Sequence, residues 1–147
     1  MDRSAALVLT VVAGGLIALQ APINSTLGRT VGTFQAAFLS FALGTVALAC
    51  IAALASGGLD AIRDARTLPW YYVTGGLLGA VYVASVLVTV RELGAGGVTA
   101  ATIASQLTIS VLIDRFGWLG AEQQPITATK VVGIVLLVAG VGLVVRG

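Results

Sequence analysis

Long runs of hydrophobic residues dominate the chain, and short polar stretches separate them. Five such segments lie at about residues 5–27, 34–56, 69–90, 98–115 and 126–145. A helix needs about 20 apolar residues to cross a hydrocarbon core of about 30 Å, and most of the segments reach that length. The apolar runs are continuous and do not alternate with polar residues, which favours helices over the strands of a membrane barrel. The pattern therefore predicts an all-α membrane protein with five transmembrane helices in one domain, residues 1–147.

Composition agrees with the pattern. Hydrophobic residues make up 58% of the chain and charged residues 10%, and the mean hydropathy is +1.04. A soluble domain carries about 25% charged residues, so this chain could not cover itself with a water-soluble surface. The first apolar run is longer than the core of a signal peptide and lacks a clean cleavage site. We therefore expect it to be a permanent helix.

The residue types that carry most enzyme chemistry are scarce. The chain has no histidine and a single cysteine, Cys50. These counts disfavour zinc sites, haem sites and histidine-based catalysis. The arginines are dispersed over the connecting segments, which disfavours nucleic-acid binding. We expect neither enzymatic activity nor a metal or other cofactor.

The basic residues divide almost evenly between the two sides that five helices would define. One side would carry Arg3, Arg63, Arg66, Arg115 and Lys130, and the other Arg29, Arg91 and Arg146. Positively charged residues favour the cytoplasmic side, so the N-terminus is expected inside. A ratio of five to three is too balanced to enforce that orientation firmly. Dual insertion is therefore compatible with the sequence.

The stretch GGLIALQAPINSTLGR, residues 14–29, places two amides and a proline inside the first predicted helix. Gln20 and Asn24 are four residues apart and share one face. Pro22 cannot donate to the carbonyl of Ala18, which predicts a kink. Two interpretations remain open. The amides either bond to a neighbouring helix, with about 0.6–2 kcal/mol for each bond, or face a cavity beside the kink.

A second polar stripe runs along the segment at 98–115. Thr102, Gln106, Ser110 and Asp114 follow one another at intervals of four. In lipid such a stripe is expected to turn towards the protein interior. Asp114 lies near a helix C-terminus, where the helix dipole disfavours an anion. It is either an ordinary charge at the membrane edge or a coupling group that pairs with Arg115, another helix or a proton.

The last segment differs from the others, because residues 131–145 include no polar side chain. Gly133 and Gly140 lie one heptad apart on it. We expect this helix to pack and to dimerise.

The remaining spans contribute isolated polar positions. The predicted substrate-binding residues are Gln20, Asn24, Ser40, Tyr82, Thr102, Gln106 and Ser110. Since these are amides and hydroxyls, they suit a neutral or zwitterionic ligand.

Four stretches together resemble a known family. They are GGLIALQAPINSTLGR, SFALG, PWYYVTGGLLGAVYV and SQLTISVLIDRFGWLG. Their order and identity are similar to the YdcZ-like family of small bacterial inner-membrane proteins, within the drug/metabolite transporter superfamily. The resemblance spans essentially the whole chain. Where the family commonly has glycine before the Gln and histidine after the Asp, this chain has Ser105 and Arg115. A titrating Asp–His pair is therefore impossible here.

The resemblance implies a multi-pass protein of the bacterial inner membrane. It also implies that five helices are half of a ten-helix inverted-repeat transporter. We therefore expect a small-molecule secondary transporter, an exporter, that works as two copies in the lipid bilayer. The second copy would be antiparallel, as a homodimer or as an oppositely oriented paralogue. A passive channel of the same architecture and a non-transporting accessory subunit are the alternatives.

Overall fold

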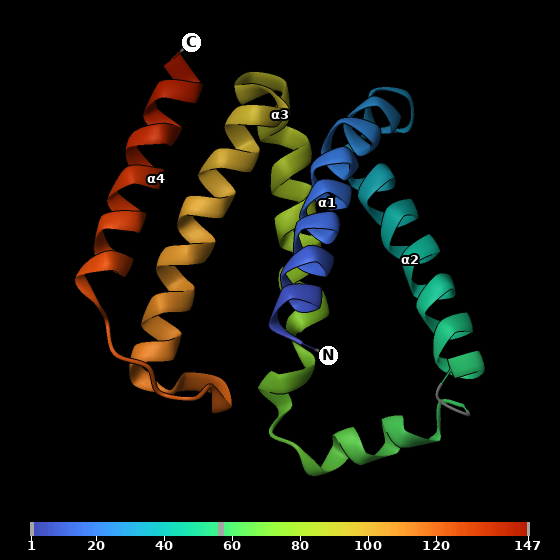
Figure 1. Cartoon of the computed structure of the whole chain (residues 1–147). Coiled ribbons are helices and arrows are strands. Elements are labelled where there is room, and N and C mark those ends of the chain that lie inside the picture. Colours follow the sequence, from blue (N-terminus) through green and yellow to red (C-terminus); the bar gives the residue numbers. More distant parts are fainter. Residues whose placement is uncertain (1, 56–57, 147) are drawn as a thin grey trace. The chain divides into compact units, whose positions relative to one another are not determined.

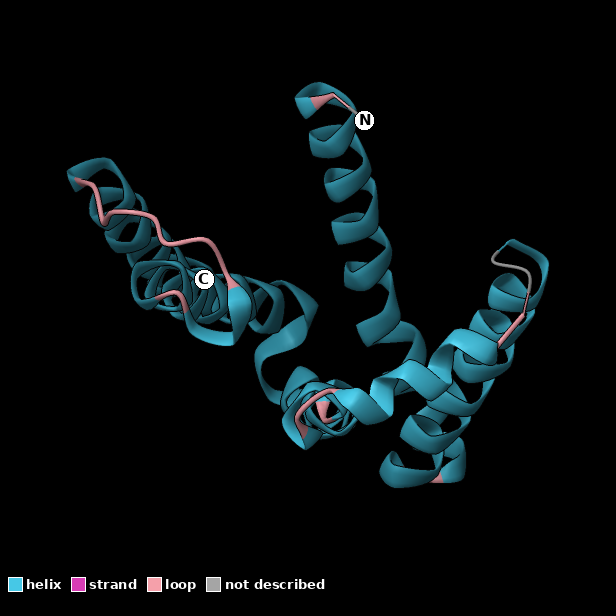
Figure 2. Cartoon of the chain, turned by 90° about the horizontal axis from the view of Figure 1, so that it is seen from below, coloured by secondary structure: helices cyan, strands magenta, loops and turns pink. Residues whose placement is uncertain are grey.

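The computed structural model describes residues 2–55 and 58–146, and these residues form helices and connecting segments (Figures 1 and 2). The α-helices are α1 (Arg3–Val31), α2 (Thr33–Ala55), α3 (Gly75–Phe116) and α4 (Ala128–Arg146). Short 3₁₀ helices lie at η1 (Asp60–Thr67), η2 (Trp70–Val73) and η3 (Trp118–Gly120). No strand occurs in the described ranges. The prediction of an all-α fold is confirmed. The predicted end of the second helix, Ser56, lies outside the described residues.

α3 contains two helical segments that meet at Gly94. The helix has 42 residues, but Gly94 has a φ of 68° and a ψ of 167°. Only glycine adopts this backbone conformation readily. At 1.5 Å per residue the whole of α3 would measure about 63 Å, roughly twice the thickness of a hydrocarbon core. α3 therefore includes both the third and the fourth predicted spans, and one residue replaces the connection expected between them.

α1 and α2 form a helical hairpin with an equally short turn. Gly32, the residue between them, has a φ of 99° and a ψ of 151°. Its N–H donates to the Gly28 carbonyl at 3.1 Å, and its own carbonyl accepts from the Ala36 N–H at 2.9 Å. Helical hydrogen bonding thus continues on both sides of the turn. For this reason α1 extends past the apolar run that predicted its end at residue 27.

Side-chain caps determine two other helix starts. The Asp2 carboxylate accepts from the Ala5 N–H at 2.7 Å, so α1 begins at Arg3. The Thr127 hydroxyl accepts from the Lys130 N–H at 3.2 Å and caps α4. Each is the contact that an N-cap residue makes to the third helical residue. By contrast, α3 begins later than the predicted residue 69, because residues 70–73 form a 3₁₀ turn.

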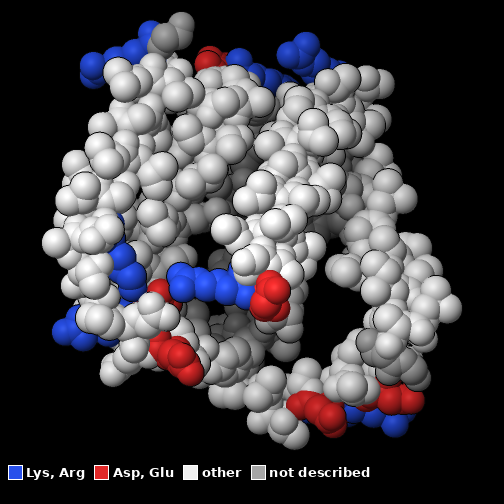
Figure 3. Space-filling model, in the orientation of Figure 1, with Lys and Arg blue, Asp and Glu red and all other residues white. Residues whose placement is uncertain are grey.

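The long helices present apolar surface on almost every side. Among the residues that the structure describes, four helices are long and apolar enough to cross a membrane, with mean hydropathies of 2.1, 2.3, 1.6 and 2.4 in chain order. Only 6%, 0%, 22% and 0% of these apolar windows is buried. The visible face in Figure 3 carries few charged side chains. Such extensive exposed apolar surface is compatible with lipid and not with water.

The chain divides into two compact units, one up to Arg91 and one from Glu92. In the first unit, Ala36 and Leu87 are fully buried and Val83 is nearly so. Gly28 lies where α1 meets these residues. A Cβ at Gly28 would lie 3.4 Å from Leu87 Cδ2 and 3.6 Å from Ala36 Cβ. In the second unit, a Cβ at Gly97 of α3 would lie 3.4 Å from Val145 Cγ2 of α4. Small residues thus permit close helix packing in both units.

The backbone at Gly94 leads to a stability prediction. Gly94→Ala should destabilise the folded chain by about 1–3 kcal/mol, because a Cβ is strained at this φ and ψ. Gly96→Ala is the matched control, since its Cβ would meet only Val144 Cγ1 at an ordinary 3.9 Å. Unfolding of both variants in mixed detergent, followed by circular dichroism, measures the difference. Equal stabilities would contradict the assignment of strain to Gly94.

Candidate functional site

The predicted site residues lie in both units. Gln20, Asn24, Ser40 and Tyr82 belong to the first unit, and Thr102, Gln106, Ser110, Asp114 and Arg115 to the second. A single cavity shared by Gln20, Asn24 and Gln106 therefore stays a prediction. Within the described ranges, no three His, Cys, Asp or Glu side chains gather where a metal ion could bind.

In the first unit, Gln20 and Asn24 of α1 line the same small pocket as Tyr82 of α3. The pocket has a volume of about 10 Å³. A cavity needs about 10–15 Å³ to hold one water molecule, so this pocket has no room for a substrate. Its other walls are apolar and include Val83 and Leu87. The common face of Gln20 and Asn24 agrees with the pattern of the sequence.

Asn24 makes a direct contact between helices. Its side chain is only 5% exposed, and its Nδ2 donates to the Ser40 Oγ of α2 at 3.1 Å. The two residues lie symmetrically about the turn at Gly32. This bond matches the first of the two interpretations, in which an amide links α1 to a neighbouring helix. In this conformation Asn24 and Ser40 bind each other, and their predicted contact with substrate stays untested.

Arg91 is a residue of this region that the sequence pattern did not single out. Its Nη2 donates to the Thr33 Oγ1 at 3.3 Å and lies 3.5 Å from the position of a Cβ at Gly28. Arg91 therefore lies at the same end of the first unit as the α1–α2 turn. Its position between two apolar segments gave no signal of this contact. Only the spacing of Arg29 and Arg91, each three residues before a turn glycine, hints at related positions.

In the second unit, Gln106 and Ser110 line one hollow on α3, together with Ser105 and Ile109. The hollow has a volume of about 270 Å³, and the side chains of Gln106 and Ser110 are exposed. The spacing of four residues thus places both on one side of the helix, as predicted. Thr102 contributes differently, because its carbonyl accepts from the Ser105 hydroxyl at 2.9 Å.

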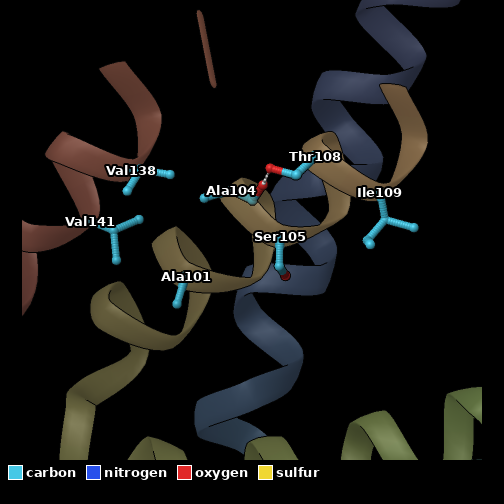
Figure 4. A pocket seen from close by; sticks show the side chains of 7 residues that line it. All are labelled: Ala101, Ala104, Ser105, Thr108, Ile109, Val138 and Val141. Atoms are coloured by element: carbon cyan, nitrogen blue, oxygen red, sulfur yellow. Dashed lines mark hydrogen bonds between the residues drawn. The ribbon is translucent and has the colours of Figure 1, made fainter. Parts of the chain in front are cut away.

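A second hollow lies between this part of α3 and α4, and Figure 4 shows the side chains that line it. Its volume is about 380 Å³. The lining residues are Ala101, Ala104, Ser105, Thr108 and Ile109 of α3 with Val138 and Val141 of α4. The apolar sequence of α4 predicts a role in packing and dimerisation. The structure shows that α4 also forms one wall of this hollow. Its sequence is entirely apolar and therefore does not indicate which side chains line a cavity.

Asp114 lies in the last turn of α3, just before the chain folds back. Its carbonyl accepts from the Gln124 N–H at 2.9 Å, and the Phe116 carbonyl accepts from Gln123 Nε2 at 3.4 Å. Gly117 has a left-handed conformation, which commonly ends a helix. Lys130 Nζ then donates to Gln124 Oε1 and to the Pro125 carbonyl, each at 3.3 Å. These bonds tie the loop to the helix end. Asp114 and Arg115 are adjacent in the helix and point in different directions, which disfavours a direct ion pair between them. Their predicted role in coupling stays a prediction.

A family model described as "Putative inner membrane exporter, YdcZ" matches residues 5–143. The chain belongs to the YdcZ family. The match includes residues of both units and nearly all of the five predicted spans, and it confirms the resemblance carried by the four sequence stretches. No curated protein and no solved structure matches this YdcZ chain. Its family is one of inner-membrane exporters by description, which agrees with the exposed apolar helices.

The bond between Asn24 and Ser40 gives a prediction for this YdcZ chain. A double-mutant cycle with Asn24→Ala and Ser40→Ala should give a coupling free energy of about 0.6–2 kcal/mol, the range for hydrogen bonds between membrane helices. Unfolding in mixed detergent measures it. The control cycle pairs Asn24→Ala with Thr45→Ala, because the Thr45 hydroxyl bonds to its own helix at the Phe41 carbonyl. A coupling no larger than in the control would contradict the interhelical role.

Proposed function

We propose that the chain is a secondary transporter that exports a small, uncharged or zwitterionic amphipathic molecule across the inner membrane. The observation that carries this proposal is the hollow beside Gln106 and Ser110. An amide that faces hydrocarbon without a partner costs several kcal/mol. In a membrane helix such side chains therefore face a cavity or another protein surface. The family description agrees with export.

A transporter fits these polar groups better than a channel does. A channel needs a continuous polar path through the membrane. In the first unit the polar pocket beside Asn24 measures only about 10 Å³ and is bounded by Val83, Val86 and Leu87. A substrate site needs only a few polar groups among apolar walls, as in the hollow beside Gln106 and Ser110. This contrast supports the proposal of transport by an occluding site.

The proposal predicts the effect of removing the Gln106 amide. Gln106→Leu should abolish saturable counterflow of substrate in proteoliposomes and leave expression and folding intact, because the side chain is exposed in the isolated chain. Leu107→Ala, at the neighbouring exposed position, is the control and should retain flux. Benzamide, an uncharged amphipathic amide, is the first tracer. Unsaturable leak would indicate a channel, and unaltered counterflow in Gln106→Leu would refute the role of the amide.

We further propose that two copies assemble antiparallel, as a homodimer or with an oppositely oriented paralogue. Inverted repeats place substrate sites near the membrane midplane, between the halves. The five-to-three division of basic residues permits both orientations. The contact between Arg91 and Thr33 supports the grouping of Arg29 with Arg91 at one membrane side. On α4, Cβ atoms at Gly133 and Gly140 would meet nothing within 4 Å, which leaves space for a partner helix.

A topology reporter at the C-terminus tests this assembly. A fusion that is active only in the cytoplasm and one active only in the periplasm should both give signal, because single chains insert in both orientations. Adding two lysines after Ser56, on the side that already carries more basic residues, should shift the ratio towards one orientation. Flux should then fall in cells that have no paralogue. Signal from one side only, with full flux and no paralogue, would exclude the antiparallel arrangement.

A further inference from the structure

Two hollows in the second unit adjoin one another. The hollow that contains Gln106 and Ser110 and the hollow between α3 and α4 have Ser105 and Ile109 in common. Their volumes are about 270 and 380 Å³. An apolar cavity of about 150 Å³ holds a benzene molecule, so the larger hollow accommodates a ring or a branched alkyl group. Together the two hollows form one composite surface, defined here by Ser105, Gln106, Ile109, Ser110 and the α4 wall.

The larger hollow is apolar although two hydroxyl residues line it. The Thr108 hydroxyl donates to the Ala104 carbonyl at 2.8 Å, and the Ser105 hydroxyl donates to the Thr102 carbonyl at 2.9 Å. The first of these bonds is the dashed line in Figure 4. Because both protons are engaged within the helix, they are not available to a ligand. In Figure 4 the methyl groups of Val138 and Val141 of α4 point into the hollow, towards α3.

The smaller hollow has the opposite chemistry. Gln106 offers an amide with donors and an acceptor, and Ser110 offers a hydroxyl, beside the apolar side chain of Ile109. None of the residues lining either hollow is ionisable. A formal charge placed there would lack a compensating partner, which is costly at low dielectric. The lining therefore favours a group that donates and accepts hydrogen bonds without carrying a net charge.

We propose that the composite surface binds a small uncharged amphipathic substrate in two parts. Its apolar ring or branched alkyl group lies between α3 and α4, against Ala101, Val138 and Val141. Its amide or hydroxyl group bonds to Gln106 and Ser110, beyond Ser105 and Ile109, which line both hollows. This rests on the proposed function, because it names the substrate class of that same site. A lipid acyl chain fits less well, since it would leave the Gln106 amide without a partner.

Four probes with the same ring separate these possibilities: benzamide is uncharged and polar, benzoate is anionic, benzylamine is cationic at neutral pH, and toluene has no polar group. Thermal unfolding of the purified full chain in lipid nanodiscs reports binding, since a ligand of the folded state raises the midpoint. Benzamide should raise the midpoint most. A larger shift with benzylamine would overturn the uncharged class and point to Asp114, one turn beyond Ser110. Equal shifts with toluene would leave only a groove for hydrocarbon and would overturn the proposal.

Variants locate the site. Ala101→Phe fills the apolar hollow and Gln106→Met removes the amide at similar length, so each should weaken benzamide binding at least about tenfold, or 1.4 kcal/mol. Val135→Phe is the matched control, because Val135 is exposed on α4 and lines neither hollow. If Ala101→Phe does not fold, Ile109→Ala opens the common wall at an exposed position and should weaken binding several-fold. Unchanged binding in the folded variants overturns the proposal.

These experiments distinguish failure of the proposed binding site from failure of the proposed transport function. If benzamide binds as described but no probe shows counterflow, the site stands and the transport function does not. If benzamide is transported but Ala101→Phe and Gln106→Met leave its affinity unaltered, transport stands and the site lies elsewhere. If Ala101→Phe instead dissociates an assembly of two copies, as size-exclusion chromatography would show, a second copy occupies the hollow and the proposal is overturned.

Discussion

The structure depends on one constraint, which is that backbone N–H and C=O groups in lipid must be paired within the protein. Helices meet this requirement by themselves, but the connections between helices do not. Here the constraint is met at Gly32 by the shortest possible turn, with helical hydrogen bonds on both sides of a single residue. Gly94 has the same extended, positive-φ conformation inside α3. Both positions need glycine, so two residues without side chains determine the two shortest connections, between α1 and α2 and within α3.

The polar side chains follow from the same constraint in two different ways. In the first unit Asn24 and Ser40 satisfy each other, and the space beside them holds at most about one water molecule. In the second unit Gln106 and Ser110 remain exposed beside a hollow. Residues of one chemical type thus have unequal surroundings. A bonded amide contributes to packing, whereas an exposed amide in an apolar helix is available to a ligand or to another chain.

The sequence predicted the helical class and the approximate spans because apolar runs of this length have few alternatives in a membrane. It also placed Gln106 with Ser110 and Gln20 with Asn24, since the helical period determines which residues lie on one face. It did not predict the long α1, because helical hydrogen bonds continue up to Gly32, past the end of the apolar run. It also did not predict that a single residue, Gly94, separates the two segments of α3. The apolar hollow was also missed. Nothing in the sequence distinguishes Val138 and Val141 from the other valines of α4. Their role in the hollow depends on how α3 packs beside them.

The one-residue turn at Gly32 has a consequence for how this chain can change its length during evolution. A residue added at Gly32 or Gly94 would change the register between the two helical segments, because a single glycine joins them at each position. Insertions and deletions should therefore accumulate instead in the segments around η1 and between α3 and α4, which contain most of the non-α-helical residues described. Homologous chains should vary in length there and keep the spacing from Asn24 to Ser40 unchanged. The register of the α1–α2 hairpin would then be inherited as a fixed unit, while the longer connections diverge.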